Sequence, residues 1–347
     1  MRIGLYGLPC SGKNYLLDKI DFMNVKYGSR IMFENNPDFN IKSLDEKNAI
    51  RTNLAKMLKE YDNFIMDGHY CFGEEVAFTE ADGNLYDVFI YLYVPSGILE
   101  ERMKLSQKNQ KYLKYDLDRW QSREINSLRK YCHMNNKDFY ILDGPDSNGI
   151  INRELALEFI KDIYFGFSCV EFARRIVTEL NIENKTIHLL DGDKTFCKED
   201  TSRKFFNYKT NIFDNNFYSG FQSWRAHKDF ERFNENIIDI SKLNIRERLL
   251  NIDSKIIITS GYPKVWKSVC NKTKIPLIFG KEISADTKYF ITKFLKEKNI
   301  IVAYGDSMVD YYMVKEAHKG YLFTNDEGNL SSSLRNMYLG GIEIVSD

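Results

Sequence analysis

Short apolar runs alternate with longer amphipathic stretches along this chain, and this alternation limits its possible folds more than any other feature. In the first half the apolar runs include RIGLYG, SRIMFE, NFIMDG and VFIYLYV, and in the second half TIHLLDGD, KIIITSG and IIVAYGDS. Runs of four to eight residues are typical of strands, and the stretches between them have helical spacing of apolar residues. Strands that alternate with helices predict the α/β class, with parallel sheets covered by helices on both faces in three layers.

The length indicates two domains. A chain of 347 residues exceeds the size at which a single core usually stops growing, and each half carries its own set of strand and helix patterns. The segment 150–181 has a helical pattern without proline, so we place the boundary near 170–183, with domains over 1–170 and 171–347. The content of hydrophobic residues, 43%, is that of a globular chain and excludes wholesale disorder.

Charge and cysteine content exclude several classes of protein. Lys plus Arg equals Asp plus Glu at 49 each, which leaves no net field for coating nucleic acid. The six cysteines form no C-x-x-C pair, so we expect reduced thiols in the cytoplasm. No apolar run reaches the roughly 20 residues of a membrane span, and the N-terminus does not read as a signal peptide. We therefore expect a cytoplasmic protein that does not bind membranes; its oligomeric state is left open.

A glycine motif follows the first apolar run. Gly7 to Lys13 matches G-x-x-x-x-G-K, between a predicted strand and a predicted helix. Such a loop turns backbone N–H groups toward a polyphosphate, and its lysine places a cation on the outer phosphates. The predicted nucleotide-binding residues of the loop are Gly7, Pro9, Cys10, Ser11, Gly12, Lys13 and Asn14. Asn14 stands where the motif has Ser or Thr to hold magnesium, so the metal arrangement is left open.

Two further signals in the first half fit phosphoryl transfer. The predicted strand NFIMD ends in Asp67, which is followed by Gly68 and His69. The carboxylate of Asp67 could hold a magnesium ion or orient an acceptor, and the alternative is a turn with no role in function. Residues 102–137 carry ten Lys or Arg against three acids. Cations there could neutralise phosphate charge, and the alternative is a solvated basic helix. The candidates are Arg102 for catalysis, and Arg119 and Arg123 for nucleotide binding.

With these motifs, residues 1–145 resemble the P-loop kinases, particularly the adenylate-kinase-like nucleoside and nucleotide kinases, in which a strand ends in acid, glycine and histidine. The resemblance implies the P-loop NTPase fold, ATP as cofactor and phosphorylation of a small acceptor. Glu34, after the run SRIMF, is the candidate for the acceptor base, although no familiar motif marks it. The proline and arginine that adenylate kinases carry after the acid and glycine are absent here.

Carboxylates follow two apolar runs in the second half. Asp191 and Asp193 follow TIHLL, and Asp306 and Asp310 follow IIVAYG. Between them lie the hydroxyls of Thr259 and Ser260 after KIII, and Lys288 at the start of a helical stretch. Each alone has a structural explanation as a turn, a helix cap or a surface lysine. Because parallel strands end at one edge of a sheet, the set is expected to converge there.

This set resembles the haloacid dehalogenase (HAD) phosphatases over residues 184–347, and the segment YGDSMVDYYMVKEA is especially similar to their phosphoserine-phosphatase branch. The resemblance implies a HAD Rossmann-like fold, Mg²⁺ and an aspartyl-phosphate. Asp191 corresponds to the nucleophile, Asp193 to the general acid and base, Ser260 or Thr259 to the phosphate-binding hydroxyl, and Lys288 to the lysine that neutralises charge. The implied metal residues are Asp191, Asp193, Asp306 and Asp310.

Residues 196–250 form a gap too long for an ordinary connection between a strand and a helix, so we predict an inserted helical cap. Its aromatic and polar residues could stack on a substrate or form a core of their own. They are Phe205, Phe206, Tyr208, Phe213, Phe217, Tyr218, Phe221, Trp224, Arg225, His227 and Lys228. Arg225 is the first of them to test.

The leading hypothesis is a bifunctional enzyme, an ATP-dependent kinase acting on a nucleotide or sugar-type small molecule fused to a Mg²⁺-dependent phosphomonoesterase. The expected partner is therefore a small phosphorylated metabolite or a nucleotide. One alternative is a polynucleotide 5′-kinase/3′-phosphatase for nucleic-acid ends, which the neutral charge balance disfavours. Another is a phosphatase regulated by a nucleotide-binding domain without catalytic activity, which Asn14 keeps open.

Overall fold

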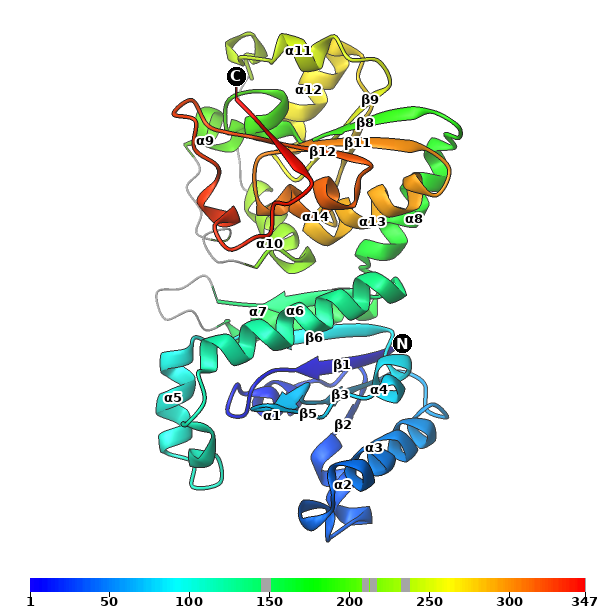
Figure 1. Cartoon of the computed structure of the whole chain (residues 1–347), viewed down its shortest axis with the longest axis vertical. Coiled ribbons are helices and arrows are strands. Elements are labelled where there is room, and N and C mark those ends of the chain that lie inside the picture. The colour runs from blue at the N-terminus through cyan, green and yellow to red at the C-terminus, as the bar shows by residue number, and fades with distance from the viewer. Residues whose placement is uncertain (145–150, 208–211, 213–216, 232–237, 347) are drawn as a thin grey trace. The chain divides into compact units, whose positions relative to one another are not determined.

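The chain folds into two compact units, Met1–Phe167 and Ser168–Asp347. The computed structural model describes residues 1–144, 151–207, 212, 217–231 and 238–346 (Figure 1). Each unit contains a parallel sheet with helices packed against it, so the predicted α/β class is confirmed. All six cysteines are free thiols. Within the described ranges, no helix combines the length and the apolar character that a membrane crossing requires.

The N-terminal unit has a five-stranded sheet in the order β2-β3-β1-β6-β7, and every neighbouring pair is parallel. Its strands are β1 Arg2–Tyr6, β2 Asn24–Lys26, β3 Phe64–Asp67, β6 Val88–Leu92 and β7 Asp138–Leu142, and a short hairpin joins β4 Cys71–Phe72 to β5 Glu75–Val76. Its α-helices are α1 Lys13–Leu17, α2 Gly28–Asn35, α3 Leu44–Leu58, α4 Glu80–Leu85, α5 Ser96–Lys104, α6 Leu117–Asn135 and α7 Arg153–Tyr164; Phe39–Ile41 and Gln110–Tyr112 are 3₁₀ turns. The order reverses at β1, so the loop after β1 lies where ligands bind in such sheets.

One predicted strand is wrong. The run SRIMF lies in helix α2, and the edge position of the sheet belongs to Asn24–Lys26. A short apolar run has the same composition in a helix as in a strand, so periodicity alone cannot separate them. Glu34 therefore lies exposed on a helix and is not among the residues that line the cavity described below.

The C-terminal unit has a six-stranded sheet in the order β10-β9-β8-β11-β12-β13, again with every pair parallel. Its strands are β8 Thr186–Leu190, β9 Lys255–Thr259, β10 Leu277–Phe279, β11 Ile300–Gly305, β12 Lys319–Phe323 and β13 Ile342–Val345. Its α-helices are α8 Cys169–Leu180, α9 Thr201–Phe206, α10 Gly220–Phe230, α11 Glu247–Leu250, α12 Pro263–Thr273, α13 Ala285–Lys296 and α14 Met308–Glu316; Gly192–Phe196 is a wide π-type turn, and Ile240–Lys242 and Ser332–Leu334 are 3₁₀ turns. The order reverses between β8 and β11.

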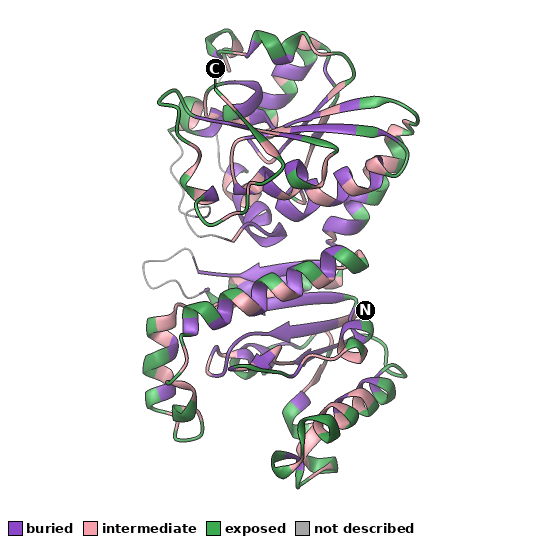
Figure 2. Cartoon of the chain, viewed as in Figure 1, coloured by how far each residue is buried: buried purple, intermediate pink, exposed green. Residues whose placement is uncertain are grey.

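Successive residues of the central strands enter two different cores, one on each face of the sheet. Leu189 packs with helices α8, α13 and α14, whereas Leu190 packs with α12 and the start of the insertion. Figure 2 shows the result, with buried strands between helices whose outer faces are exposed. The sheet is thus covered on both faces, and the ends of its strands remain as the place for a site.

The insertion between β8 and β9 begins and ends at neighbouring points. Cys197 and Ile245 form an isolated antiparallel β-bridge, and the backbone N–H of Arg246 donates to the carbonyl of Phe196 at 3.0 Å. Its buried aromatic residues Tyr218 and Phe230 belong to the two cores of the sheet. Part of the predicted cap is therefore packed into the core of the domain. Tyr208 and Phe213 lie outside the described residues.

Candidate functional site

The candidate site of the C-terminal unit lies where β8 and β11 end side by side. Asp191 directly follows β8 and Asp306 directly follows β11, and these two strands are paired in parallel. Since the strand order reverses at this pair, the connections leave on opposite faces and open a crevice at the strand ends. The predicted convergence of the acids at one edge therefore has a direct structural basis.

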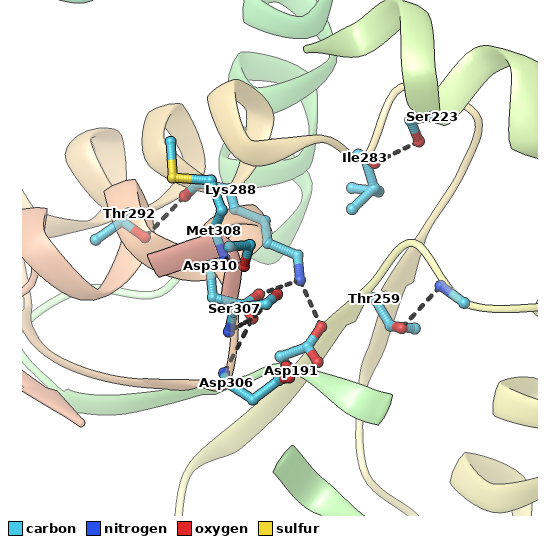
Figure 3. A network of polar contacts seen from close by, with 12 residues as sticks. Asp191, Ser223, Thr259, Ile283, Lys288, Thr292, Asp306, Ser307, Met308 and Asp310 are labelled. Carbon is cyan, nitrogen blue, oxygen red and sulfur yellow. Dashed lines mark hydrogen bonds and ion pairs between the residues drawn. The ribbon is translucent and has the colours of Figure 1, made fainter. Parts of the chain in front are cut away.

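Lys288 joins two of these carboxylates from helix α13. Its Nζ donates to Oδ1 of Asp191 at 2.5 Å and to Oδ1 of Asp310 at 2.7 Å (Figure 3). The lysine side chain is fully buried, 0% exposed, so this cation has left water entirely. A buried ammonium is stable only where opposite charges and hydrogen bonds compensate for lost hydration, as they do here.

Asp310 connects this lysine to the loop after β11. Its second oxygen, Oδ2, accepts from the backbone N–H groups of Asp306 at 3.1 Å and Ser307 at 3.3 Å, and from the Ser307 hydroxyl at 3.2 Å. Gly305 allows this approach, because a Cβ at that position would lie 2.2 Å from the Cβ of Asp310. Asp310 therefore shapes the loop that presents Asp306.

Three acids could hold a metal ion. One carboxylate oxygen from each of Asp191, Asp306 and Asp310 lies within 4.8 Å of the others. Clustered carboxylate oxygens are the ligands that Mg²⁺ prefers, so the donor set fits the predicted ion. Asp193, which was also predicted as a ligand, is not a member of this group.

The electrostatics of the cluster are those of crowded, buried acids. Burial and the charge of Asp310 raise the pKa of Asp191 to about 7, although Lys288 opposes the shift. Burial, Asp310 and Asp191 raise the pKa of Asp306 well above its ordinary value. Burial would lower the pKa of Lys288, but Asp191 and Asp310 together raise it. A divalent cation among these acids would favour their ionised forms.

Asp193 turns away from the cluster. The chain reverses at Lys194, whose φ of 58° lies in the left-handed region, and Oδ1 of Asp193 accepts from the backbone N–H of Thr201 at 2.9 Å. Burial, and then the charge of Asp200, raise the pKa of Asp193 to about 6. A carboxyl group with this pKa can both give and take a proton near neutral pH, which suits the role predicted for it.

Two hydroxyls follow β9, as predicted, and they face different surroundings. Thr259 is buried, and its Oγ1 accepts from the backbone N–H of Gly261 at 3.0 Å beside the turn that carries Asp191. Ser260 lines a cavity of about 10 Å³ with Ser223 and Ser284. That volume is near the minimum for one water molecule.

The sequence offered no signal for two residues of this site. Lys194 lies close enough to Asp306, Asp200 and Asp193 that their charges raise its pKa although burial opposes this. Trp266, on α12, packs against the turn at Gly192. An aromatic residue on an apolar helix face looks like any core residue in a sequence.

The glycine motif of the N-terminal unit forms a loop with three positive φ angles. They belong to Gly7 (149°), Cys10 (66°) and Gly12 (99°). A Cβ at Gly7 would lie 2.8 Å from the carbonyl oxygen of Leu92, so glycine is required there by space as well as by φ. Glycine is the residue that adopts such angles without strain, which explains the two fixed positions of the motif.

Lys13 and Arg102 both contact this loop. Lys13 Nζ donates to the carbonyls of Gly7 at 2.6 Å and Leu8 at 3.2 Å, and burial lowers its pKa to about 8. Arg102, from α5, donates to the carbonyls of Cys10 at 3.2 Å and Ser11 at 3.4 Å. The loop thus carries two cations from different elements, as a polyphosphate site requires.

Asp67 lies at the end of β3, next to β1, and lines a cavity of about 980 Å³ together with Lys13 and Asn14. Its Oδ1 accepts from the backbone N–H of Gly28 at 2.7 Å. His69 lines the same cavity, and burial and Lys13 lower its pKa well below the ordinary value. A cavity of this size fits a small acceptor beside a nucleotide.

Arg51 lines the same cavity from α3 and was missed in the sequence. It is 7% exposed, and its Nη1 donates to Asn48 at 2.8 Å. Among the described residues, no carboxylate lies within 4.0 Å of its guanidinium. It lies on the buried face of the helix with Ala55 and Leu58. A charged residue at a position where the helical spacing predicts an apolar one was the sequence signal that could have identified it.

The structure does not bring the other two arginines to the loop. Arg119 is exposed on α6, and Arg123 donates to the carbonyl of Gly73 at 3.4 Å and to Glu74 at 3.1 Å. Neither lines the cavity. Their assignment to nucleotide binding stays a prediction without geometric support.

A buried acid holds the segment after Asp67 in place. Glu124, on α6, accepts from the backbone N–H of Cys71 at 2.9 Å, the hydroxyl of Tyr91 at 2.9 Å and the indole N–H of Trp120 at 3.3 Å. Burial raises its pKa, although these donors oppose the shift. The acid therefore connects β4, β6 and α6 in the interior.

Comparisons with known proteins give only distant likenesses. No family model matches the chain, and no curated protein matches it significantly. Similar solved structures include a shikimate kinase from Aquifex aeolicus (16% identity, 48% of this chain and 97% of that chain, TM-score 0.32). Others are shikimate kinases from Acinetobacter baumannii, in complex with shikimate (14%, 47% and 92%, 0.35), and from Bacteroides thetaiotaomicron (16%, 47% and 98%, 0.31).

Proposed function

We propose that the chain is a bifunctional enzyme whose C-terminal unit hydrolyses phosphomonoesters and whose N-terminal unit transfers a phosphoryl group from ATP to a small acceptor. The observation that carries the proposal is the buried Lys288, which bridges Asp191 and Asp310 beside Asp306 at the reversal of the strand order. A lysine with a purely structural role would be neutralised by one carboxylate, whereas three acids crowd together here at the ends of the strands. A site that handles phosphoryl groups needs a cation for the phosphate oxygens and carboxylates for attack and for a metal ion.

In the phosphatase, a carboxylate oxygen of Asp191 attacks phosphorus, and the bond from phosphorus to the leaving oxygen breaks. Asp193 gives its proton to that oxygen, so the product leaves as an alcohol. A water molecule then attacks the phosphorus of the aspartyl-phosphate while Asp193 takes its proton, which releases phosphate and restores Asp191. Lys288 balances the charge of the phosphoryl oxygens, and Mg²⁺ bound by Asp191, Asp306 and Asp310 would supply further positive charge.

In the kinase, the loop Gly7–Lys13 would hold the ATP phosphates, with Lys13 and Arg102 as cations. Asp67 would orient the acceptor hydroxyl in the adjoining cavity. Arg51 in the same cavity has no carboxylate within 4.0 Å among the residues described, which favours an acceptor with a negatively charged group, because a buried guanidinium is costly without an opposite charge. A phosphorylated nucleoside or sugar has that charge.

The decisive experiment measures both activities on purified full-length chain with Mg²⁺. We expect hydrolysis of p-nitrophenyl phosphate in the wild type, its loss in Asp191→Asn, and unchanged ATP binding in that variant. Lys13→Met should show the reverse, weak ATP binding with normal hydrolysis. Full hydrolysis by Asp191→Asn would refute the phosphatase. ATP binding without transfer to any anionic acceptor would refute the kinase in favour of a nucleotide sensor.

A further inference from the structure

The indole ring of Trp266 lies between the two loops that carry the phosphatase residues. A Cβ at Gly192 would lie 2.5 Å from Cζ2 of Trp266, and a Cβ at Gly261 would lie 2.6 Å from its Nε1. Gly192 separates Asp191 from Asp193, and Gly261 follows the hydroxyls of β9. Both positions are therefore glycine so that the ring can approach the loops this closely.

The N–H group of this indole is buried without an acceptor. Trp266 is 0% exposed, and within the part of the chain that the structure describes, its Nε1 has no hydrogen-bond partner. The indole N–H is a donor only, so no rotation of a hydrogen or choice of tautomer can satisfy it. A buried donor left without a partner is costly, and such groups in native proteins call for an explanation.

A carboxylate oxygen of Asp193 lies near this donor. Oδ2 of Asp193 and Nε1 of Trp266 each lie 2.6 Å from the same point, the position that a Cβ of Gly261 would occupy. The other oxygen of Asp193 already accepts from the backbone N–H of Thr201. The two atoms therefore lie close to each other, and Oδ2 of Asp193 is the candidate acceptor for the indole N–H group.

We propose that Trp266 is a positioning residue for Asp193, an inference that rests on the proposed phosphatase function. When Asp193 gives its proton to the leaving oxygen, the resulting carboxylate gains a hydrogen bond from Nε1–H that is stronger to the anion than to the neutral acid. The donor thereby stabilises the state formed as the ester bond breaks. It also holds the carboxyl group in the orientation that transfers the proton.

The role predicts a dependence on the leaving group. p-Nitrophenolate departs without needing a proton, whereas the alkoxide of β-glycerophosphate needs one. Trp266→Phe removes the N–H and keeps an aromatic ring in the core. We expect this variant to lose at least about tenfold in kcat/KM with β-glycerophosphate, the effect of about one hydrogen bond to a charged group, and less than about threefold with p-nitrophenyl phosphate.

Two comparisons separate this role from a loss of folding. Trp224→Phe removes another buried indole from the same unit, on α10, and should change both substrates by the same small factor. In an Asp193→Asn background, Trp266→Phe should have no further effect on β-glycerophosphate, because the two residues act through one proton transfer. If Trp266→Phe is unstable, the benzothiophene analogue of tryptophan at position 266 keeps the shape of the indole and lacks only the donor.

The outcomes are distinct. A larger loss with the alkyl phosphate, absent in the Asp193→Asn background, supports the inference. Equal losses on both substrates, or losses that multiply with those of Asp193→Asn, overturn it while leaving the phosphatase intact. If the wild type hydrolyses neither ester, the proposed function itself fails, and the inference fails with it.

Discussion

Replacing Lys288 by methionine tests the electrostatic account of the C-terminal unit most directly. The substitution keeps an unbranched apolar side chain of nearly the same length and removes the cation that contacts Asp191 and Asp310. Breaking a buried ion pair in this way costs about 3–5 kcal/mol, because the remaining charges stay buried without compensation. In a unit of 180 residues, Ser168–Asp347, each kcal/mol corresponds to about 2–4 °C, so the midpoint should fall by about 6–20 °C.

The stability that Lys288→Met loses should increase with pH. Burial and mutual repulsion raise the pKa values of Asp191 and Asp306 in the folded chain, so the folded state binds protons more tightly than the unfolded state. The contribution of these two acids to stability is therefore greatest at acid pH and falls as the pH rises through the folded pKa, which for Asp191 is about 7. The variant should lose less stability at pH 5 than at pH 8, and Mg²⁺ should restore part of the loss at pH 8.

Calorimetry of the full chain, with and without Mg²⁺ at both pH values, measures these effects. Lys296→Met is the matched control, since Lys296 lies on the same helix, α13, and pairs with Glu316 near the surface. That pair is partly exposed and should contribute no more than about 1 kcal/mol. A Lys288→Met variant as stable as the control, or a loss equal at pH 5 and pH 8, would refute the reasoning.

The remaining predictions concern both units. ATP affinity should fall between pH 7 and pH 9, because burial lowers the pKa of Lys13 to about 8 and the cation is lost above it; titration calorimetry that finds constant affinity would contradict this. Arg51→Met should raise KM for an anionic acceptor about tenfold or more and leave ATP binding unchanged, and an equal effect on an uncharged acceptor would count against it. Gly192→Ala should destabilise the C-terminal unit by about 1–3 kcal/mol, because its Cβ would lie 2.5 Å from Trp266, and Trp266→Phe should relieve part of the loss in urea unfolding.

Features that depend on residues adjacent in the chain were predictable from the sequence. The loop Gly7–Lys13 has the backbone angles that its glycines imply, and the acids after β8 and β11 meet because parallel strands end at one edge. Local patterns failed where composition is ambiguous, as for SRIMF, or where a strand is only three residues long, as for Asn24–Lys26. Local patterns also do not show which way a polar side chain on a helix points. The sequence therefore could not distinguish Arg102, which contacts the loop, from Arg119 and Arg123, which do not.

Side-chain geometry was beyond the sequence for a different reason. The turn at Lys194, which has a left-handed backbone, separates Asp193 from the three acids of the candidate metal site although it lies two residues from Asp191. The contact of Trp266 with both loops depends on the packing of α12, which no spacing in the chain encodes. Such long-range contacts require coordinates.

The buried acid Glu124 has a consequence for tracing the ancestry of this chain. Three hydrogens from different elements point at its two oxygens. The backbone N–H of Cys71 and the indole N–H of Trp120 can only donate and share Oε1, whereas the Tyr91 hydroxyl at Oε2 can also accept. The position therefore requires an acceptor oxygen, which glutamate or glutamine supplies and an apolar residue does not. The surrounding leucines, isoleucines and valines can exchange for one another during evolution. A glutamate or glutamine at this position should therefore be retained longer than the apolar residues and identify distant relatives after those have diverged.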